Sequence, residues 1–154
     1  MGGEEIPELP SDQVIEGVTF TVTQEGVRQA LLVADTAYMH QDSSVVDLVG
    51  MDLRVFDEAG RENAHVTSAT GVLNTRTQAM TARGNARLVT SDGSTITTEE
   101  LHYDPAGNRI WSDMPTVMVQ RGGTRVEGTG FTSDPEFRNY RIQGARTQGG
   151  AVRF

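Results

Sequence analysis

Residues 82–104 read ARGNARLVTSDGSTITTEELHYD, and this stretch decides the fold. Apolar and polar side chains alternate on both sides of Asp92-Gly93, which is the period of a half-buried β-strand. An Asp-Gly pair between two such runs is a strong signal for a tight β-hairpin. Gly84 lies inside the first run, where a glycine favours a bulge or a kink. The stretch therefore predicts an antiparallel hairpin with a kinked first strand.

Turns of this kind recur along the whole chain. They are centred at Gly26, Gly60, Gly93 and the Gly122-Gly123 pair, so the successive steps are 34, 33 and 30 residues. A second family of polar turns lies between them, at residues 41–44, 74–77, 104–108 and 134–137. A unit of two strands and two turns cannot bury its apolar face alone and needs neighbours. The repeat predicts an all-β fold, an open and twisted stack of short antiparallel strands.

Most of the expected strands are three to six residues long. Residues 45–49 and 51–56 are expected as two strands, and so are residues 64–68 and 72–73. The glycines between or near such runs are interpreted as bulges or kinks at the corners of the sheet: Gly50, Gly71, Gly84 and Gly128. The only helical expectation is a single turn at residues 11–16.

The length of 154 residues indicates one domain, which is enough chain for a continuous core. Residues 1–13 contain two prolines and three glutamates and are predicted to be a flexible lead-in. Residues 14–143 are predicted to form the β domain, and residues 144–154 a flexible tail. The Met-Gly-Gly opening lacks the features of a signal peptide, so we expect a natural anchor or export signal to have been removed.

Composition argues against several classes of partner. The net charge is −8, and the thirteen basic residues are all arginines scattered along the chain. An acidic chain without a basic cluster is a poor ligand for nucleic acid, and it has no polybasic patch for a membrane surface. Cysteine is absent, so neither a disulfide nor a thiolate metal site is expected. The longest apolar run, residues 30–34, is far shorter than the roughly 20 residues of a transmembrane helix.

No catalytic, metal or cofactor site is predicted. The chain has no nucleophile elbow and no phosphate-binding loop. Glu99 and Glu100 are adjacent, so in a strand they point to opposite faces, whereas a glycosidase needs two acids that face one sugar. Trp111 is either a sugar-stacking platform or an ordinary surface residue. The histidines are 25 and 37 residues apart, which is not a metal-ligand spacing: His40, His65 and His102.

An alternating aliphatic stripe is the main feature left to explain. One interpretation is a closed, dry core. The other is a groove between two sheets that stand apart, lined by the stripe and able to accept acyl chains. The residues alone leave both interpretations open. The stripe consists of Leu53, Val55, Val66, Met80, Leu88, Ile96, Leu101, Tyr103, Ile110, Val117, Val119, Val126 and Phe131.

Four segments, taken in order, resemble a known family. They are the Leu-x-Ala-Asp sequence at residues 32–35, the units at 50–57 with 64–69 and at 82–104 with 110–117, and the Gly-x-Gly-Phe sequence at 128–131. Together they resemble the LptC family of periplasmic lipopolysaccharide-export components, within the wider LptA/OstA-like superfamily of β-jellyroll proteins. The resemblance covers about residues 18 to 143. It departs from the family at Ala30, where a tryptophan is common, and in the absence of the N-terminal membrane helix.

The resemblance implies a non-enzymatic lipid conduit with a β-jellyroll fold. Its cargo would be lipopolysaccharide or a related glycolipid, with the acyl chains in the groove formed by the stripe. Its partners would be the subunits of an inner-membrane ABC transporter and an LptA-like bridge protein, joined by edge-strand pairing. The implied edges are Val18, Phe20 and Val22 toward the transporter, and Tyr140 and Ile142 toward the bridge. The implied location is the periplasm, with an inner-membrane anchor in the full-length protein.

Three rival interpretations remain. The first is a structural β-stack that polymerises end to end and has a filled core. The second is a polysaccharide-active enzyme, which would require a paired-acid cleft with aromatic platforms. The third is the soluble bridge protein of the same pathway, which differs by lacking an anchor. Self-association through edge strands is compatible with several of these interpretations.

Overall fold

The computed structural model of the chain describes residues 13–148, and its twelve strands form one antiparallel sheet. This confirms the predicted all-β, jellyroll-like fold. Residues 13–16 belong to the first strand, so the helical turn expected at 11–16 is wrong there, and residues 11 and 12 lie outside the described residues. Across residues 13–148 no helix is long and apolar enough to cross a membrane. The long strands are β2 (Gln13–Gln24), β3 (Val27–Met39), β4 (Val45–Phe56), β5 (Glu62–Asn74), β6 (Met80–Thr90) and β7 (Thr95–Asp104).

The remaining six strands are short, with three or four residues each: β8 (Arg109–Ser112), β9 (Thr116–Val119), β10 (Arg125–Gly128), β11 (Gly130–Ser133), β12 (Tyr140–Gln143) and β13 (Arg146–Gln148). The expectation that most strands have three to six residues is therefore wrong for β2 to β7, which have 10 to 13 residues. Residues 45–49 and 51–56, for example, form one strand, β4. The physical reason is that Gly50, with φ of 71°, bends the strand without ending its pairing.

A line of bends crosses the long strands. Gly17 on β2 lies opposite Asp35 on β3, which lies opposite Gly50 on β4, as the flanking pairs show. The line continues through Ala69 on β5 to Gly84 on β6, where the register shifts. We call this line the crease.

Burial on β4 shows what the crease does. Val46 and Leu48 are buried before Gly50, and Met51, Leu53 and Val55 are buried after it. The buried side chains therefore lie at even-numbered positions before the bend and at odd-numbered positions after it, because the bend reverses which face of the strand points inward. Each long strand therefore contributes one half to each of two facing layers, which we call the first leaf and the second leaf.

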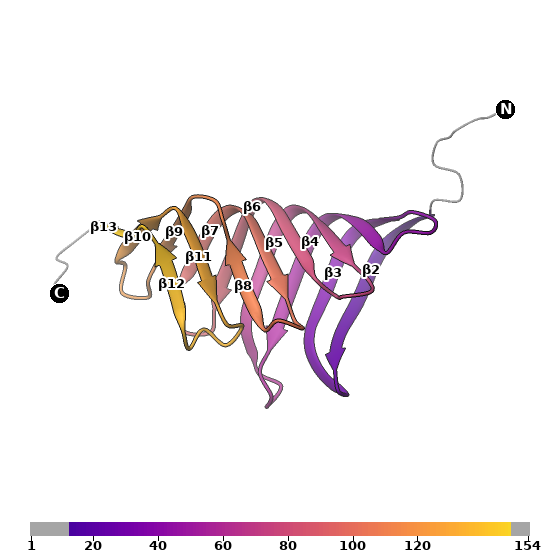
Figure 1. Ribbon diagram of the computed structural model, residues 1–154, viewed down its shortest axis with the longest axis horizontal. Coiled ribbons are helices and arrows are strands. Elements are labelled where there is room, and N and C mark those ends of the chain that lie inside the picture. The colour runs from indigo at the N-terminus through magenta and orange to yellow at the C-terminus, as the bar shows by residue number, and fades with distance from the viewer. Residues whose placement is uncertain (1–12, 149–154) are drawn as a thin grey trace.

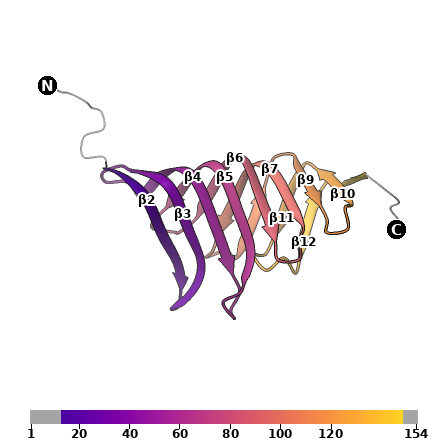
Figure 2. The same ribbon diagram turned by 180° about the vertical axis from the view of Figure 1, so that it is seen from behind.

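Beyond β7 the two leaves consist of different strands. The C-terminal half of β7 pairs with β8, and its N-terminal half pairs with β9. The first leaf continues through β8, β11 and β12, while the second continues through β9, β10 and β13. Figures 1 and 2 show the leaves as near and far layers, with β2 and β13 toward opposite ends of the long axis.

The two predicted families of turns lie on the two free rims of the leaves. The glycine turns, at residues 25–26, 57–61, 91–94 and 120–124, connect strand ends in the second leaf. The other family, at residues 40–44, 75–79, 105–108 and 134–139, connects strand ends in the first leaf. Residues 146–148, which the sequence placed in a flexible tail, pair with β10. The other predicted boundaries stay predictions.

Candidate functional site

The candidate site is the interior between the two leaves. Paired residues on successive strands place apolar side chains in a row that crosses the second leaf from β2 to β10. With about 4.8 Å between neighbouring strands, the seven steps of this row span about 34 Å. The inner members are at most 3% exposed, whereas the two end members are half-buried. The row consists of Phe20, Leu32, Leu53, Val66, Leu88, Ile96, Met118 and Val126.

Most of the predicted groove residues lie in this interior. Ten of them are buried in one core: Leu53, Val55, Val66, Met80, Leu88, Ile96, Leu101, Tyr103, Ile110 and Phe131. Val126 is half-buried and packs against that core. Val117 and Val119 lie elsewhere. They flank the buried Met118 on β9 and therefore share the outward face, where Val119 is 37% exposed.

Several interior residues were missed from the sequence, among them Met51, Leu48 and Ala82, each at most 3% exposed. For Leu48 the reason is the bend at Gly50, because an alternation pattern continued straight through a bend assigns the wrong face to every residue beyond it. Gly50 carried the signal that could have corrected this, because a bulge at a glycine shifts the parity by one residue. Met51 and Ala82 share the parity of Leu53 and Met80, so the alternation itself would have found them.

The interior is almost filled. A cavity of about 10 Å³ lies between the leaves, bounded by Met51, Leu53 and Val66 on one side and by Met80 and Tyr103 on the other. That is room for about one water-sized probe, which is far too little for an acyl chain. Burial raises the pKa of the Tyr103 hydroxyl above its ordinary range. In this structure the apolar row is therefore a packed core.

The interior is less covered at the β2 end. Ile15 lies opposite Ala37, which is 1% exposed, yet Ile15 itself is 39% exposed. Val18 and Phe20 are only half-buried. The reason is the position of β2 at the end of the strand order, because no further strand covers its interior side chains. The apolar interior is thus accessible at this end.

Both predicted partner segments lie at ends of the sheet. Val18, Phe20 and Val22 belong to β2, whose 12 residues pair with β3 only. Tyr140 and Ile142 belong to β12, which pairs with β11 only. The outer side of such a strand presents unpaired N–H and C=O groups, the usual template for another strand.

A buried hydroxyl network holds the leaves together where they separate. Thr98 Oγ1 lies 2.9 Å from Ser112 Oγ and donates to the carbonyl oxygen of Pro115 at 2.9 Å. Thr116 Oγ1 donates to the carbonyl oxygen of Met114 at 2.9 Å. Thr98, Ser112 and Thr116 are at most 5% exposed. These bonds fix the segment that passes from β8 to β9.

The histidines and Trp111 lie away from the interior. His40 Nε2 is 2.9 Å from Asp47 Oδ2, and His65 Nε2 is 2.8 Å from Asp52 Oδ1. On the outward face, Trp111 stacks on His102, with ring centroids 5.0 Å apart, and the Arg109 guanidinium lies 4.3 Å from its ring centroid. Within residues 13–148, no group of three or more potential ligands could hold a metal ion.

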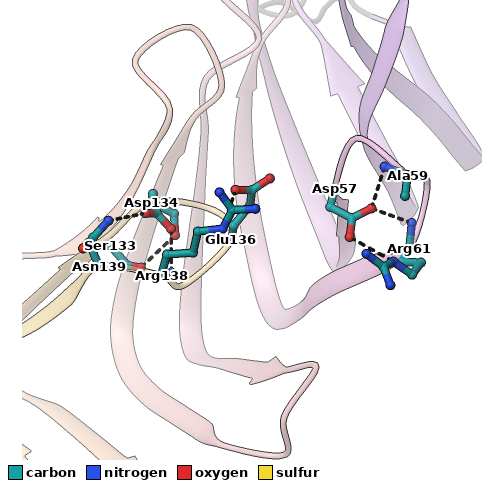
Figure 3. Close-up of polar contacts among 8 residues, drawn as sticks. All are labelled: Asp57, Ala59, Arg61, Ser133, Asp134, Glu136, Arg138 and Asn139. Carbon is teal, nitrogen blue, oxygen red and sulfur yellow. Dashed lines mark hydrogen bonds and ion pairs between the residues drawn. The ribbon is translucent and has the colours of Figure 1, made fainter.

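The acidic residues of the rim turns cap their own loops (Figure 3). Asp57 Oδ1 accepts from the backbone N–H groups of Ala59 and Arg61, both at 2.9 Å. The hydrogen bond from the Arg61 backbone is the main reason that the pKa of Asp57 is lowered. Asp134 likewise accepts from the Arg138 backbone at 3.0 Å. These carboxylates therefore have structural partners within their turns.

Within residues 13–148 the chain forms an open, creased β-jellyroll with an apolar interior, and three of its strands, β2, β12 and β13, have only one neighbour each. The family model described as "Lipopolysaccharide-assembly, LptC-related" matches residues 6–147 of the chain. The chain belongs to the LptC family, whose members are periplasmic components of lipopolysaccharide transport. No curated protein matches the chain. The resemblance seen in the sequence is thereby confirmed, and with it an involvement in lipopolysaccharide transport.

Proposed function

We propose that this domain is a segment of a conduit that carries lipopolysaccharide from an inner-membrane ABC transporter toward an LptA-like bridge protein. The observation that carries the proposal is the apolar row, which runs through the interior from β2 to β10 and is partly exposed at both ends. Acyl chains would lie along this row, and the sugar-phosphate head would stay in water outside the leaves. The protein would catalyse no reaction.

The energetics suit a carrier. Each methylene group that leaves water contributes about 0.8 kcal/mol, so a few acyl chains gain enough to be held away from solvent. Contacts with a row of similar aliphatic side chains are non-directional, so a chain can slide from one set to the next. Few fixed polar groups face the row, which leaves little to trap the cargo.

Loading requires the leaves to part, because the existing cavity of about 10 Å³ cannot hold a chain. The β2 end is where this needs the least rearrangement, since Ile15, Val18 and Phe20 are already partly exposed. We assign the β2 edge to the transporter subunits and the β12 edge to the bridge protein, each joined by strand addition. The full-length protein would be anchored in the inner membrane.

Photocrosslinking with lipopolysaccharide tests the conduit. Probes at Leu88 and Leu101 face the interior, and probes at the neighbouring Arg87 and His102 face outward. We expect lipid adducts at the two interior positions and at neither outward position. A probe at Val119 should also fail, because that side chain points outward. Equal adducts at both faces, or none at Leu88 and Leu101, would contradict the proposal.

The filled core favours one second candidate, a structural β-stack that polymerises end to end. Its free β2 edge could pair with the opposite end of another copy. Gel filtration over a concentration series separates the two functions. Unlimited growth in size without lipid binding would support the stack, whereas a fixed size with bound lipid would support the conduit.

A further inference from the structure

We infer that Met51 is a movable side chain that occupies the first acyl-chain pocket of the interior, and that its displacement opens this pocket. The inference rests on the proposed conduit function and adds the place where a chain first fits. Met51 directly follows Gly50, so it projects from the second leaf at the crease, and it is 3% exposed.

The side chain of Met51 is seated against Gly71 of the first leaf. A Cβ atom added at Gly71 would lie under 3.0 Å from the Met51 sulfur and 3.0 Å from the carbonyl oxygen of Thr81. Gly71 itself lies between Leu48 and Ala82 in an interior row of the first leaf. The missing side chain at 71 therefore forms a notch that holds the end of Met51.

The seat adjoins the cavity between the leaves. Met51 lines this cavity together with a second methionine, Met80, while Leu53, Val66 and Ile110 form other parts of its wall. Methionine is unbranched and has three rotatable bonds, so it can adopt new rotamers within a packed core. The branched neighbours have fewer alternatives. If the end of Met51 rotates away, its volume is added to the cavity and the enlarged pocket is lined by apolar atoms.

The chemistry of this wall selects one kind of ligand. Aliphatic and thioether groups bound the space, and the Tyr103 side chain is the polar exception among the residues that line it. An uncharged hydrocarbon chain fits such a wall, whereas a sugar or a phosphate would leave its polar groups unpaired. The occupant is therefore a single acyl chain.

Opposite substitutions at the two sides of the seat test this assignment, with dodecanoic acid as the probe and displacement of bound parinaric acid as the readout. Met51→Ala removes the movable group, so it should bind the probe about tenfold more tightly than the unmodified protein, a gain of about 1.4 kcal/mol. Gly71→Ala fills the notch and pushes Met51 into the cavity, so it should weaken binding. Met114→Ala, at a half-buried methionine that belongs neither to the apolar row nor to the cavity wall, is the control and should leave the affinity unchanged.

A measurement on the unmodified protein avoids dependence on the folding of these variants. With ¹³C-methyl methionine labelling, dodecanoic acid should shift the methyl resonances of Met51 and Met80 and leave that of Met114 in place. A Met51 resonance that does not respond at saturation would overturn the inference, and so would equal tightening by Met51→Ala and Met114→Ala. If lipopolysaccharide still crosslinks at Leu88 in that case, the conduit stands and only the role of Met51 fails.

Discussion

At the scale of single residues, Gly84 and Gly60 differ in surroundings but share a backbone conformation. Their φ angles are 85° and 84°, a region that side chains with a Cβ rarely adopt. A Cβ at Gly60 would meet nothing within 4 Å, whereas a Cβ at Gly84 would lie 2.9 Å from the Cβ of Ala69 across the crease. An alanine substitution at Gly60 therefore measures the cost of the backbone conformation alone, whereas the same substitution at Gly84 adds the cost of a steric clash with Ala69.

We expect Gly60→Ala to lower the free energy of unfolding by about 1–2 kcal/mol, which is the cost of placing an alanine in the left-handed backbone conformation. Gly84→Ala should cost about 1–3 kcal/mol more, because Ala69 cannot move without a shift of β5. Urea denaturation of both variants checks this. Equal destabilisation would show that the crease has room for a methyl group.

Asp57 and Asp92 give the protein an acid-dependent stability. Hydrogen bonds, from the Arg61 backbone to Asp57 and from the Thr90 side chain to Asp92, lower the pKa of each carboxyl below its ordinary 3.8. Groups with a lowered pKa in the folded state stabilise it above that ordinary value and lose this contribution as the pH falls further. Thermal melts should therefore show a fall in Tm below about pH 4 that is smaller in Asp57→Asn. An unchanged pH profile in that variant would contradict this role of Asp57.

At the scale of elements, the hydrogen bonds of the buried hydroxyl groups between β7, β8 and β9 contribute to the stability of the fold. Thr98→Val keeps the shape of the side chain but removes its bonds to Ser112 and to the carbonyl oxygen of Pro115. We expect a loss of about 1–3 kcal/mol, because buried groups are left unpaired. Thr97→Val, one residue away on the outward face, is the control and should change stability by at most about 0.5 kcal/mol. Similar effects of the two substitutions would argue against the network.

The free edge of β2 can be tested with proline at two adjacent, partly exposed positions. Val14 and Ile15 are 58% and 39% exposed, so either substitution removes little packing. Neighbouring N–H groups in a strand point to opposite sides, so one variant breaks a bond to β3 and the other removes only an outward donor. The second variant should keep the Tm and lose binding to the transporter subunits. Undiminished binding by that stable variant would exclude edge pairing through this half of β2.

At the scale of the whole molecule, the sheet is a stack of strands that branches after β7, and each strand contacts mainly the strands with which it pairs. Such stacks lose structure from their ends, where a strand has one neighbour only. Hydrogen exchange should therefore be fastest in β2, β12 and β13 and slowest in β5 and β6. Uniform protection would indicate that the two leaves unfold as one cooperative unit.

The stack was predictable from the sequence, and the crease was not. Evenly spaced turns such as Gly60 and Asp92-Gly93 predicted two strands per repeat and two separate rows of turns. Alternation placed Leu53, Leu88 and Ile96 correctly inside, because they lie within uninterrupted halves of strands.

The failures have different causes. Leu48 was missed because Gly50 shifts the buried parity of β4, whereas Met51 has the same parity as Leu53 and was omitted from an otherwise correct alternation. In β9 the wrong face was chosen because both outward residues, Val117 and Val119, are valines, while one of the buried positions is a threonine, Thr116. Whether a bend ends a strand or only folds it depends on contacts with both neighbouring strands, which local sequence does not contain.

The unequal ends of the sheet have one more consequence. One end is a single 12-residue strand that spans both leaves, and the other is divided between β12 and β13, with four and three residues. If the two ends of the sheet were alike, two copies could join in a symmetric dimer. Because the ends differ, domains that join one end to the other all point in the same direction. A row of such domains would have a distinct head and tail, so that the order in which the domains are joined would also set the direction in which a cargo moves along the row.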